Sequence, residues 1–176
     1  MKLYTKILNE ETKECQIINQ EDAQKLGWQE YEVEQSYDGR IYLKGYCPQQ
    51  PLDELKKAKR KEINQDRDTA EQGGFSYMGK VFDSDAVSCI RMSCAAQAMN
   101  TLSIQEGQPE PNITWTCKDN TTIDLNVTEI LGLVTALAQW SNKCHEKATQ
   151  LKLKIEEAQT PEDLELIHWN NEVSNE

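Results

Sequence analysis

Cysteine and histidine are the side chains of this sequence that are best suited to nucleophilic or metal chemistry. The two histidines are His145 and His168, and His145 directly follows Cys144. Neighbouring residues on a helix point about 100° apart, so Cys144 and His145 cannot form a thiolate–imidazolium pair with each other. We therefore expect a buried Cys144 beside a solvent-facing His145, and no catalytic dyad.

The cysteines do not show the spacing of a redox or zinc motif. They are Cys15, Cys47, Cys89, Cys94, Cys117 and Cys144. No Cys-x-x-Cys pair occurs, and the chain is too long and too helical for a disulfide mini-domain. Cys89 and Cys94 are five residues apart on an expected helix, which points them to different faces. We expect reduced, mostly buried thiols.

Two carboxylates, Asp83 and Asp85, stand close together before an expected helix. Two carboxylates without further oxygen ligands make a weak cation site, and helix capping explains them better. The sequence contains no HExxH, GxSxG or GxxxxGK[ST] motif. We therefore expect a non-enzymatic protein with no catalytic residue, no metal site and no cofactor.

Several aromatic side chains fall in expected strands. They could line a small-molecule or glycan pocket, or they could form the core of hairpins, where large rings bury much apolar area. We favour the core interpretation and keep the aromatic surface as the alternative. The residues are Trp28, Tyr31, Phe75, Tyr77, Phe82 and Trp115.

The formal net charge is −11, which argues against nucleic acid as a partner because phosphate binding depends on Lys and Arg. The basic run KKAKRK at 56–61 would spread around a helix, and nearby acidic residues neutralise it. Apolar stretches are too short for a membrane span, and the N-terminal residues lack the apolar core of a signal peptide. We expect no membrane span and no secretion by a signal peptide.

Residues 1–47 predict a small β-rich unit with one short helix. Apolar and polar residues alternate in KLYTKIL and WQEYEVEQS, and Asp38-Gly39 is typical of a tight hairpin. In the second stretch, Trp28, Tyr31 and Val33 are the candidate inward positions. Pro and Gln residues at 48–51 break the pattern and indicate a linker.

Residues 52–169 predict a mainly helical domain, so the expected fold class is α+β. A charged helix at 52–72 ends at Gly73-Gly74, and a hairpin at 75–83 leads to a helix at 84–105. Ser84 or Asp83 is the expected N-cap of that helix. Its expected buried face consists of Val87, Ile90, Cys94, Ala98 and Thr101 or Leu102.

A second hairpin at 113–125 repeats this architecture, and Asn126 with Glu129 predicts a capping box at the start of the next helix. The two hairpins could pair into one small sheet. Three main helices and two hairpins therefore make up the domain. TPEDLELIHW adds a short final helix, and 170–176 is expected to be a frayed tail.

The helix at 127–158 carries the strongest periodic signal. Apolar and small residues step by four and three over about four heptads, which predicts packing along the whole helix. The pattern does not separate an intramolecular bundle from an oligomeric coiled coil. The proposed helix-interface residues are Ile130, Val134, Leu137, Cys144, Leu151 and Ile155.

Three runs carry a resemblance to a known family: RDTAEQGGFSYMGKVFDSDAVSCIRM, ITWTCKDNTTIDLNVTEILGLVTAL and KIEEAQTPEDLELIHW. Over about residues 55–169 the chain resembles the family catalogued as domain of unknown function 4376. Members of that family are found mainly in tailed bacteriophages and prophages, commonly near tail-fibre genes. The preceding GWQEYEVEQSYDGRIYLKGYCPQQP is more loosely similar to β-rich leaders of phage tail proteins.

The resemblance implies a phage tail context and supplies no catalytic residues. We expect a structural or attachment component associated with the tail fibre. Alternatives are a tail-fibre assembly chaperone and a small-molecule-binding or host-directed phage protein. The expected partners are tail or fibre proteins and a homo-oligomer, with a trimer favoured. The expected location is the virion, or the host cytoplasm during assembly.

Overall fold

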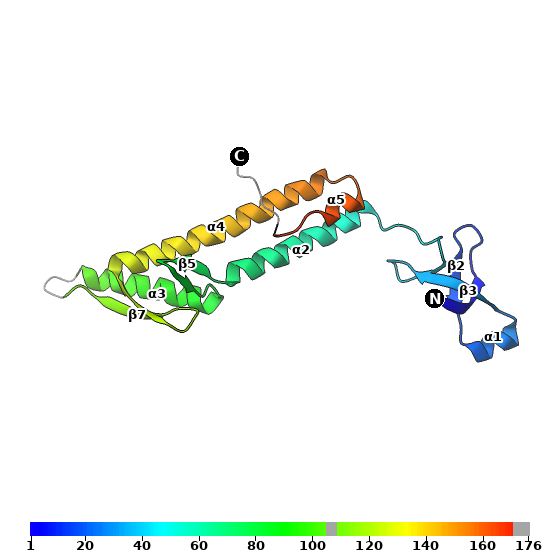
Figure 1. The fold of residues 1–176 in the computed structure, drawn as a ribbon, viewed down its shortest axis with the longest axis horizontal. Coiled ribbons are helices and arrows are strands. Elements are labelled where there is room, and N and C mark those ends of the chain that lie inside the picture. The colour runs from blue at the N-terminus through cyan, green and yellow to red at the C-terminus, as the bar shows by residue number, and fades with distance from the viewer. Residues whose placement is uncertain (105–108, 171–176) are drawn as a thin grey trace. The chain divides into compact units, whose positions relative to one another are not determined.

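The computed structural model describes residues 1–104 and 109–170 (Figure 1). The fold is α+β, with N-terminal strands followed by a mainly helical region, which confirms the expected fold class. The chain divides into two compact units, Met1–Glu54 and Leu55–Glu176.

The N-terminal unit is a closed antiparallel barrel of four strands in the order β1-β2-β4-β3. A short helix, α1, connects β2 to β3. Asn19 caps α1 by accepting a hydrogen bond from the Asp22 N–H at 3.0 Å, and Gly27 ends it in the left-handed conformation. The elements are β1 (Lys2–Ile7), β2 (Glu14–Ile17), α1 (Gln20–Leu26), β3 (Gln29–Gln35) and β4 (Ile41–Leu43).

The barrel encloses few side chains, because four strands leave little room inside. Cys15, Val33 and Tyr42 are buried. Among the residues expected to point inward, Val33 does so, Trp28 is half-buried, and Tyr31 is 37% exposed. Tyr31 is not buried as expected: it lies on the same face of β3 as Val33, but it is partly exposed and its hydroxyl donates to Gln29 Oε1 at 3.0 Å.

The second unit is built around one long helix, α4, which the other elements cover. In Figure 1, α2 runs beside the C-terminal half of α4 and α3 beside its N-terminal half. α2 and α4 are antiparallel, since Lys56 bonds the carbonyl of Glu156 while Glu71 contacts His145. The elements are α2 (Leu52–Gln72), β5 (Phe75–Tyr77), β6 (Lys80–Phe82), α3 (Ala86–Ser103), β7 (Asn112–Thr116), β8 (Thr122–Asn126), α4 (Val127–Glu157) and α5 (Pro161–Glu165).

α4 begins with the expected capping box. The Asn126 side chain accepts from the Glu129 N–H, and the Glu129 carboxylate accepts from the Asn126 N–H, both at 2.9 Å. The reciprocal bonds satisfy two backbone donors that the first turn would otherwise leave without partners.

α3 differs from its prediction in both its cap and its buried face. Asp85 is the N-cap and accepts from the Val87 and Ser88 N–H groups at 2.9 and 3.2 Å, so Ser84 and Asp83 were wrong. The buried residues are Met92, Ala96 and Met99. The face predicted to be buried is exposed instead: it consists of Val87, Ile90, Cys94, Ala98 and Leu102.

The α3 error has a physical cause in its composition. AVSCIRMSCAAQAMNTLS is apolar or small nearly all round, so two faces at helical spacing compete for burial. The long, adaptable Met92 and Met99 fill the space against α4, and the β-branched Val87 and Ile90 are left outside.

The two hairpins form separate two-stranded sheets, so they do not pair into the single small sheet that the sequence left open. β5 and β6 turn at Met78-Gly79, where both residues have positive φ, as a two-residue hairpin turn requires. The hairpins meet where the Lys118 N–H donates to the Val81 carbonyl at 2.9 Å. This contact is made by the loop of one hairpin, so the strands do not extend one ladder.

A continuous core joins the hairpins to α3 and to the N-terminal half of α4. Phe75 and Phe82 face each other across β5 and β6, with ring centroids 5.9 Å apart. The buried members are Phe75, Phe82, Met92, Ala96, Met99, Trp115, Cys117, Leu125, Ile130 and Leu133. The hairpins therefore pack against α3 and the N-terminal half of α4 in one core.

After α4 the chain turns back along α2 and α4. Thr160, Pro161 and Asp163 form the expected start of α5, with Thr160 accepting from the Asp163 N–H at 3.1 Å. Leu164 and Ile167 are buried. Of the predicted tail at 170–176, residues 171–176 lie outside the described residues.

Candidate functional site

One hollow of the helical unit lies where the end of α2 meets the start of α3 and the middle of α4. It has a volume of about 350 Å³. Polar and thiol groups from three helices and one loop converge on it, and this makes it the first candidate for chemistry. It is lined by Glu71, Gln72, Ser84, Ala86, Cys89, Leu137 and Ser141.

Glu71 is the centre of this hollow and bonds to three other segments. One carboxylate oxygen accepts from the Ser141 hydroxyl, and the other lies 3.4 Å from His145 Nε2. The backbone carbonyl of Glu71 accepts from the Ser84 hydroxyl at 2.5 Å. The Ser84 oxygen in turn accepts from the Gly74 N–H at 2.8 Å. We call Glu71, Ser84, Ser141 and His145 the α2–α4 clasp.

The α2–α4 clasp contains a serine, a histidine and a carboxylate, but their order differs from that of a hydrolytic triad. In a triad, the histidine lies between the serine and the acid and takes the serine proton. Here Glu71 lies between Ser141 and His145. Ser141 therefore donates to a carboxylate and has no imidazole to activate it. The polar contacts of this cluster therefore hold α2 against α4.

The two thiols beside the clasp are poor nucleophiles. Cys89 is half-buried, and its thiol donates to the Ser84 carbonyl at 3.4 Å. Burial raises the pKa of Cys89, and the nearby carboxylates of Asp85 and Glu71 raise it further. Burial and Glu71 likewise raise the pKa of Cys144. The reactive form of cysteine is the thiolate, so both thiols remain protonated and inert near neutral pH.

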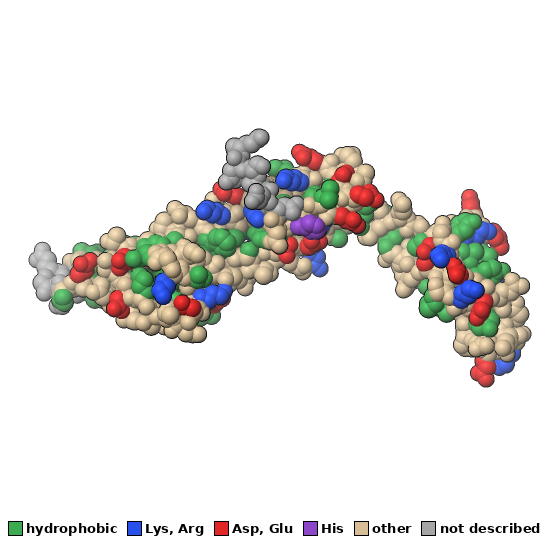
Figure 2. Space-filling view, viewed as in Figure 1, with side chains coloured by type: hydrophobic (Ala, Val, Ile, Leu, Met, Phe, Trp, Pro, Cys, Tyr) green, Lys and Arg blue, Asp and Glu red, His purple; other side chains and the backbone are tan. Residues whose placement is uncertain are grey.

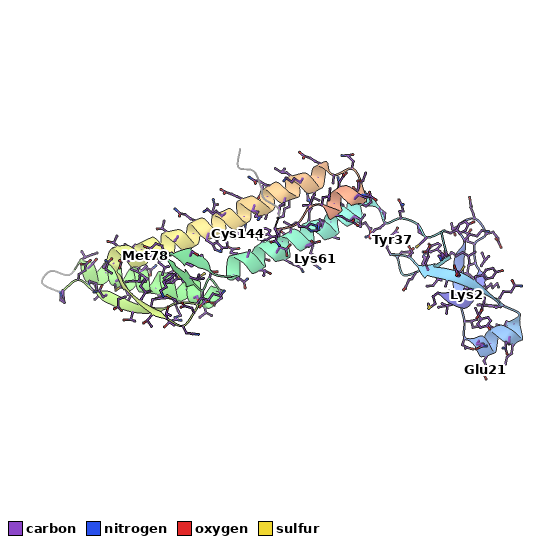
Figure 3. All side chains as sticks on the ribbon, viewed as in Figure 1. Lys2, Glu21, Tyr37, Lys61, Met78 and Cys144 are labelled. Atoms are coloured by element: carbon purple, nitrogen blue, oxygen red, sulfur yellow. The ribbon has the colours of Figure 1, made fainter. Side chains whose placement is uncertain are left out.

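All six cysteines lie within the described residues and are free. Cys15, Cys117 and Cys144 are buried, Cys47 and Cys89 are intermediate, and Cys94 is exposed. Figure 3 shows Cys144 on the side of α4 that faces α2. His145 is about half exposed beside it, so the two adjacent residues point apart as helix geometry requires.

Three further hollows lie on the surfaces of the two units. One of about 240 Å³ lies between α2 and α5 and includes Leu55, Ala58 and Leu164. Another, of about 450 Å³, lies beside Trp169, whose ring has Lys147 Nζ 5.2 Å from its centroid. A third, of about 530 Å³, lies on the N-terminal unit beside Trp28 and Tyr31. Within residues 1–104 and 109–170, no three His, Cys, Asp or Glu side chains are grouped to hold a metal ion.

The proposed helix-interface residues of α4 are packed inside the chain. Ile130, Cys144, Leu151 and Ile155 are buried, with exposures of 0 to 3%. Val134 and Leu137 are half-buried, and Leu137 also lines the hollow at the α2–α4 clasp. This chain's own elements therefore occupy most of the seam.

The predicted aromatic residues fall into two separate sets. Phe75, Phe82 and Trp115 are buried, and Tyr77 is partly buried against the same core. The guanidinium of Arg91 lies 5.2 Å from the centroid of the Trp115 ring. Trp28 and Tyr31 belong to the N-terminal unit instead. The structure therefore does not show the six aromatics as one surface.

Sequence reasoning missed residues that act through close contact. Gly132 lies inside α4, where an added Cβ would overlap the Tyr77 hydroxyl. A glycine inside a helical pattern is the signal that could have revealed this close approach. Lys118 reaches the carbonyl of Gly73 at the end of α2, and neither Lys118 nor Glu71 carries a sequence signal for its role.

Comparisons with known proteins bear on the helical unit. A family model described as Domain of unknown function (DUF4376) matches residues 54–168, more than half of the 176-residue chain. No curated protein and no solved structure matches. Among the described residues, no helix has the length and apolar character needed to cross a membrane.

Proposed function

Because this chain belongs to the DUF4376 family, we propose that it is a non-enzymatic structural or attachment component associated with a bacteriophage tail fibre. The phage part of the proposal depends on the resemblance, since members of the family are found mainly in tailed bacteriophages and prophages. The proposed location is the virion, or the host cytoplasm during assembly. Its proposed partners are tail or fibre proteins, with no role for nucleic acid.

The observation that supports a non-enzymatic role is the internal use of the polar cluster. Glu71 accepts from Ser141 and contacts His145, and this order leaves no activated nucleophile at the hollow. The thiols of Cys89 and Cys144 have raised pKa values. The groups best suited to catalysis therefore serve to pack helices.

We also propose a homo-oligomer, but the packing of α4 inside one chain means that the α4 heptad is not the argument for it. The heptad pattern of α4 favours a trimer only if α4 forms a seam between chains. Cys144, Leu151 and Ile155 are instead buried within one chain. An oligomer would therefore use a different surface, and the α4 pattern no longer favours three chains over two.

The test of this function is quantitative mass spectrometry of purified virions from a phage that encodes the chain. We expect a fixed copy number relative to the fibre protein, retained through density-gradient purification. A host protein of similar abundance in the lysate is the control for carry-over. Absence from virions together with absence from any fibre complex would overturn the proposal.

An assembly chaperone is the second candidate. The exposed apolar side chains on α3, including Val87 and Ile90, could cover a fibre segment before assembly. For a chaperone, the chain would co-purify with the fibre protein from infected cells and would be missing from mature virions. The same two samples therefore separate the two candidates.

A small-molecule-binding protein is the third candidate, favoured by the mainly apolar hollow between α2 and α5. A ligand held there would be released when the protein is denatured. Mass spectrometry of the small-molecule fraction before and after denaturation detects it, and an empty fraction removes this candidate.

A further inference from the structure

One face of α3 exposes apolar and small side chains to solvent. Val87 is 66% exposed, Ile90 64% and Leu102 46%. Cys94 and Ala98 lie between them at helical spacing and are also exposed. We call Val87, Ile90, Cys94, Ala98 and Leu102 the α3 face. Contiguous exposed apolar surface of this kind is typical of an interaction site.

The residues outside the described ranges are poor candidates to cover the α3 face. Residues 105–108 read QEGQ and residues 171–176 read NEVSNE. Together they contain a single aliphatic side chain, Val173. Neither segment has enough apolar surface to bury five side chains at helical spacing.

The charge of α3 favours a second copy of this chain over a charged partner. The chain has a net charge of −11, and acidic side chains are spread over the helical unit in Figure 2. α3 contains no acidic residue, and Arg91 is its one charged residue. Arg91 is exposed on the same side of α3, about one turn from Val87 and from Cys94, and its guanidinium lies over Trp115. Two copies can therefore meet through α3 without opposing acidic groups.

The shape of the face is self-complementary. α3 extends from Ala86 to Ser103, so Cys94 lies at its midpoint and Val87 and Leu102 lie near its ends. The small Cys94 and Ala98 at the centre allow two helix axes to approach closely. The larger Val87, Ile90 and Leu102 lie on either side of them. An antiparallel pair with its twofold axis at Cys94 brings each Cys94 next to its counterpart, and it keeps the two Arg91 side chains apart because each lies about one turn from the axis.

We propose that the α3 face is the docking site for a second copy of this chain, which forms a twofold dimer. An 18-residue helix is about 27 Å long and about 10 Å wide with its side chains. Two such faces, each about 270 Å² in projection, bury on the order of 500 Å², which is below the roughly 1,000 Å² of a stable specific interface and fits a weak, transient contact. The dimer is therefore reversible and dissociates on dilution. It requires neither the phage-tail function nor a fibre partner.

The first test is the molar mass of the full chain by light scattering over a concentration series. We expect a shift from 20.2 kDa towards twice that value as concentration rises. Ile90→Glu introduces a charge into the α3 face and should hold the protein at monomer mass. Leu153→Glu, at a 59% exposed position on α4, is the matched control and should leave the dimer intact. Circular dichroism of both variants verifies that they remain folded.

The second test uses Cys94 as a reporter of proximity. Diamide oxidises two thiols to a disulfide and is itself reduced to the hydrazine. We expect a reducible covalent dimer that Cys94→Ser abolishes and Ile90→Glu suppresses. Cys89→Ser is the control and should not reduce the yield, because Cys89 is half-buried near Ser84.

Three outcomes overturn the proposal: a monomer at all concentrations, a dimer or trimer that survives Ile90→Glu, and crosslinking by Cys94 at equal yield with and without Ile90→Glu. Binding of a fibre protein to a chain that stays monomeric would also overturn it and would support the chaperone candidate. Presence or absence in virions has no bearing on these results, so this inference and the proposed function fail separately.

Discussion

At the scale of single residues, Gly132 shows how one missing Cβ determines a contact between elements. Tyr77 of β5 lies against α4 where Gly132 leaves room for its hydroxyl. Glycine inside a helix costs about 1 kcal/mol relative to alanine. The packing of Tyr77 against α4 offsets that cost.

We expect Gly132→Ala to destabilise the protein although it improves helix propensity. Overpacking of this kind costs about 1–3 kcal/mol. Tyr77→Phe removes the atom nearest to the added methyl group and leaves the ring carbon Cζ 3.1 Å away, so Gly132→Ala should destabilise much less in that background. Urea unfolding of the four proteins in this double-mutant cycle measures the effect. A stabilising Gly132→Ala in the wild-type background would contradict the contact.

Other residues were predicted from sequence because their signals are local. Asn126 and Glu129 form the expected capping box, and Thr160 and Pro161 start α5 as expected. The α3 cap was misassigned by one or two positions. Ser84 and Asp85 are both good capping residues, and Ser84 is held by Glu71 and Gly74, which are distant in sequence.

At the scale of elements, the N-cap of α3 makes stability depend on pH. Hydrogen bonds from the Ser88 hydroxyl, and from the Ser88 and Val87 backbone N–H groups, hold the pKa of Asp85 below its ordinary value of 3.8. A lowered folded pKa means that the stabilisation is fully present above the unfolded value. It is lost as pH falls through the folded value.

We therefore expect the free energy of unfolding to fall when pH drops below about 4, with Asp85 contributing to the slope. Asp85→Asn retains a good capping oxygen but does not titrate, so the variant should show a shallower loss over the same range. Urea unfolding at a series of pH values, for wild type and variant, gives both slopes. Identical slopes would show that Asp85 does not carry this linkage.

The α4 seam offers a second test with a control on the same helix. Leu151 is 0% exposed and Leu153 is 59% exposed. Leu151→Ala should cost about 2–5 kcal/mol because it leaves a cavity in packed surroundings. Leu153→Ala should change stability by no more than about 0.5 kcal/mol. Thermal or urea unfolding compares the two, and equal effects would contradict the packing of the seam.

α3 and α4 differ in how far their periodicity predicts burial. On α4, polar residues such as Lys143 and Glu146 occupy the faces beside the buried seam, so only one face of the helix is apolar. α3 carries one charged residue, and two faces satisfy the same spacing. Periodicity predicts the buried face of a helix only when its faces differ in polarity. Where they do not differ, as on α3, the elements that pack against the helix determine which face is buried.

At the scale of the whole molecule, the chain consists of a barrel unit and a helical unit with distinct cores. The barrel core includes Val33 and Tyr42, and the helical core includes Phe82 and Leu133. The aromatic residues predicted as one set are divided between these cores. A shared surface for them had no local sequence signal to support it.

Because the chain is strongly acidic, the lack of acidic residues on α3 affects where two copies can associate. A net charge of −11 opposes association between copies except where a surface lacks acidic groups. α3 is such a surface, with Val87 and Ile90 exposed on it. Self-association is therefore proposed through α3, and the α4 heptad serves the interior of one chain.

The sequence by itself determined the α+β class, the positions of the hairpins and the long capped helix of α4. These features depend on neighbours within a few residues, such as the Met78-Gly79 turn and the Asn126 cap. Only the tertiary structure decided which face of α3 is buried, where Ser84 bonds, and that Glu71 lies between Ser141 and His145. Those choices depend on residues as far apart in sequence as Glu71 and Ser141, which are separated by 70 positions, and Glu71 and His145. Long-range packing of this kind leaves no local pattern in the chain.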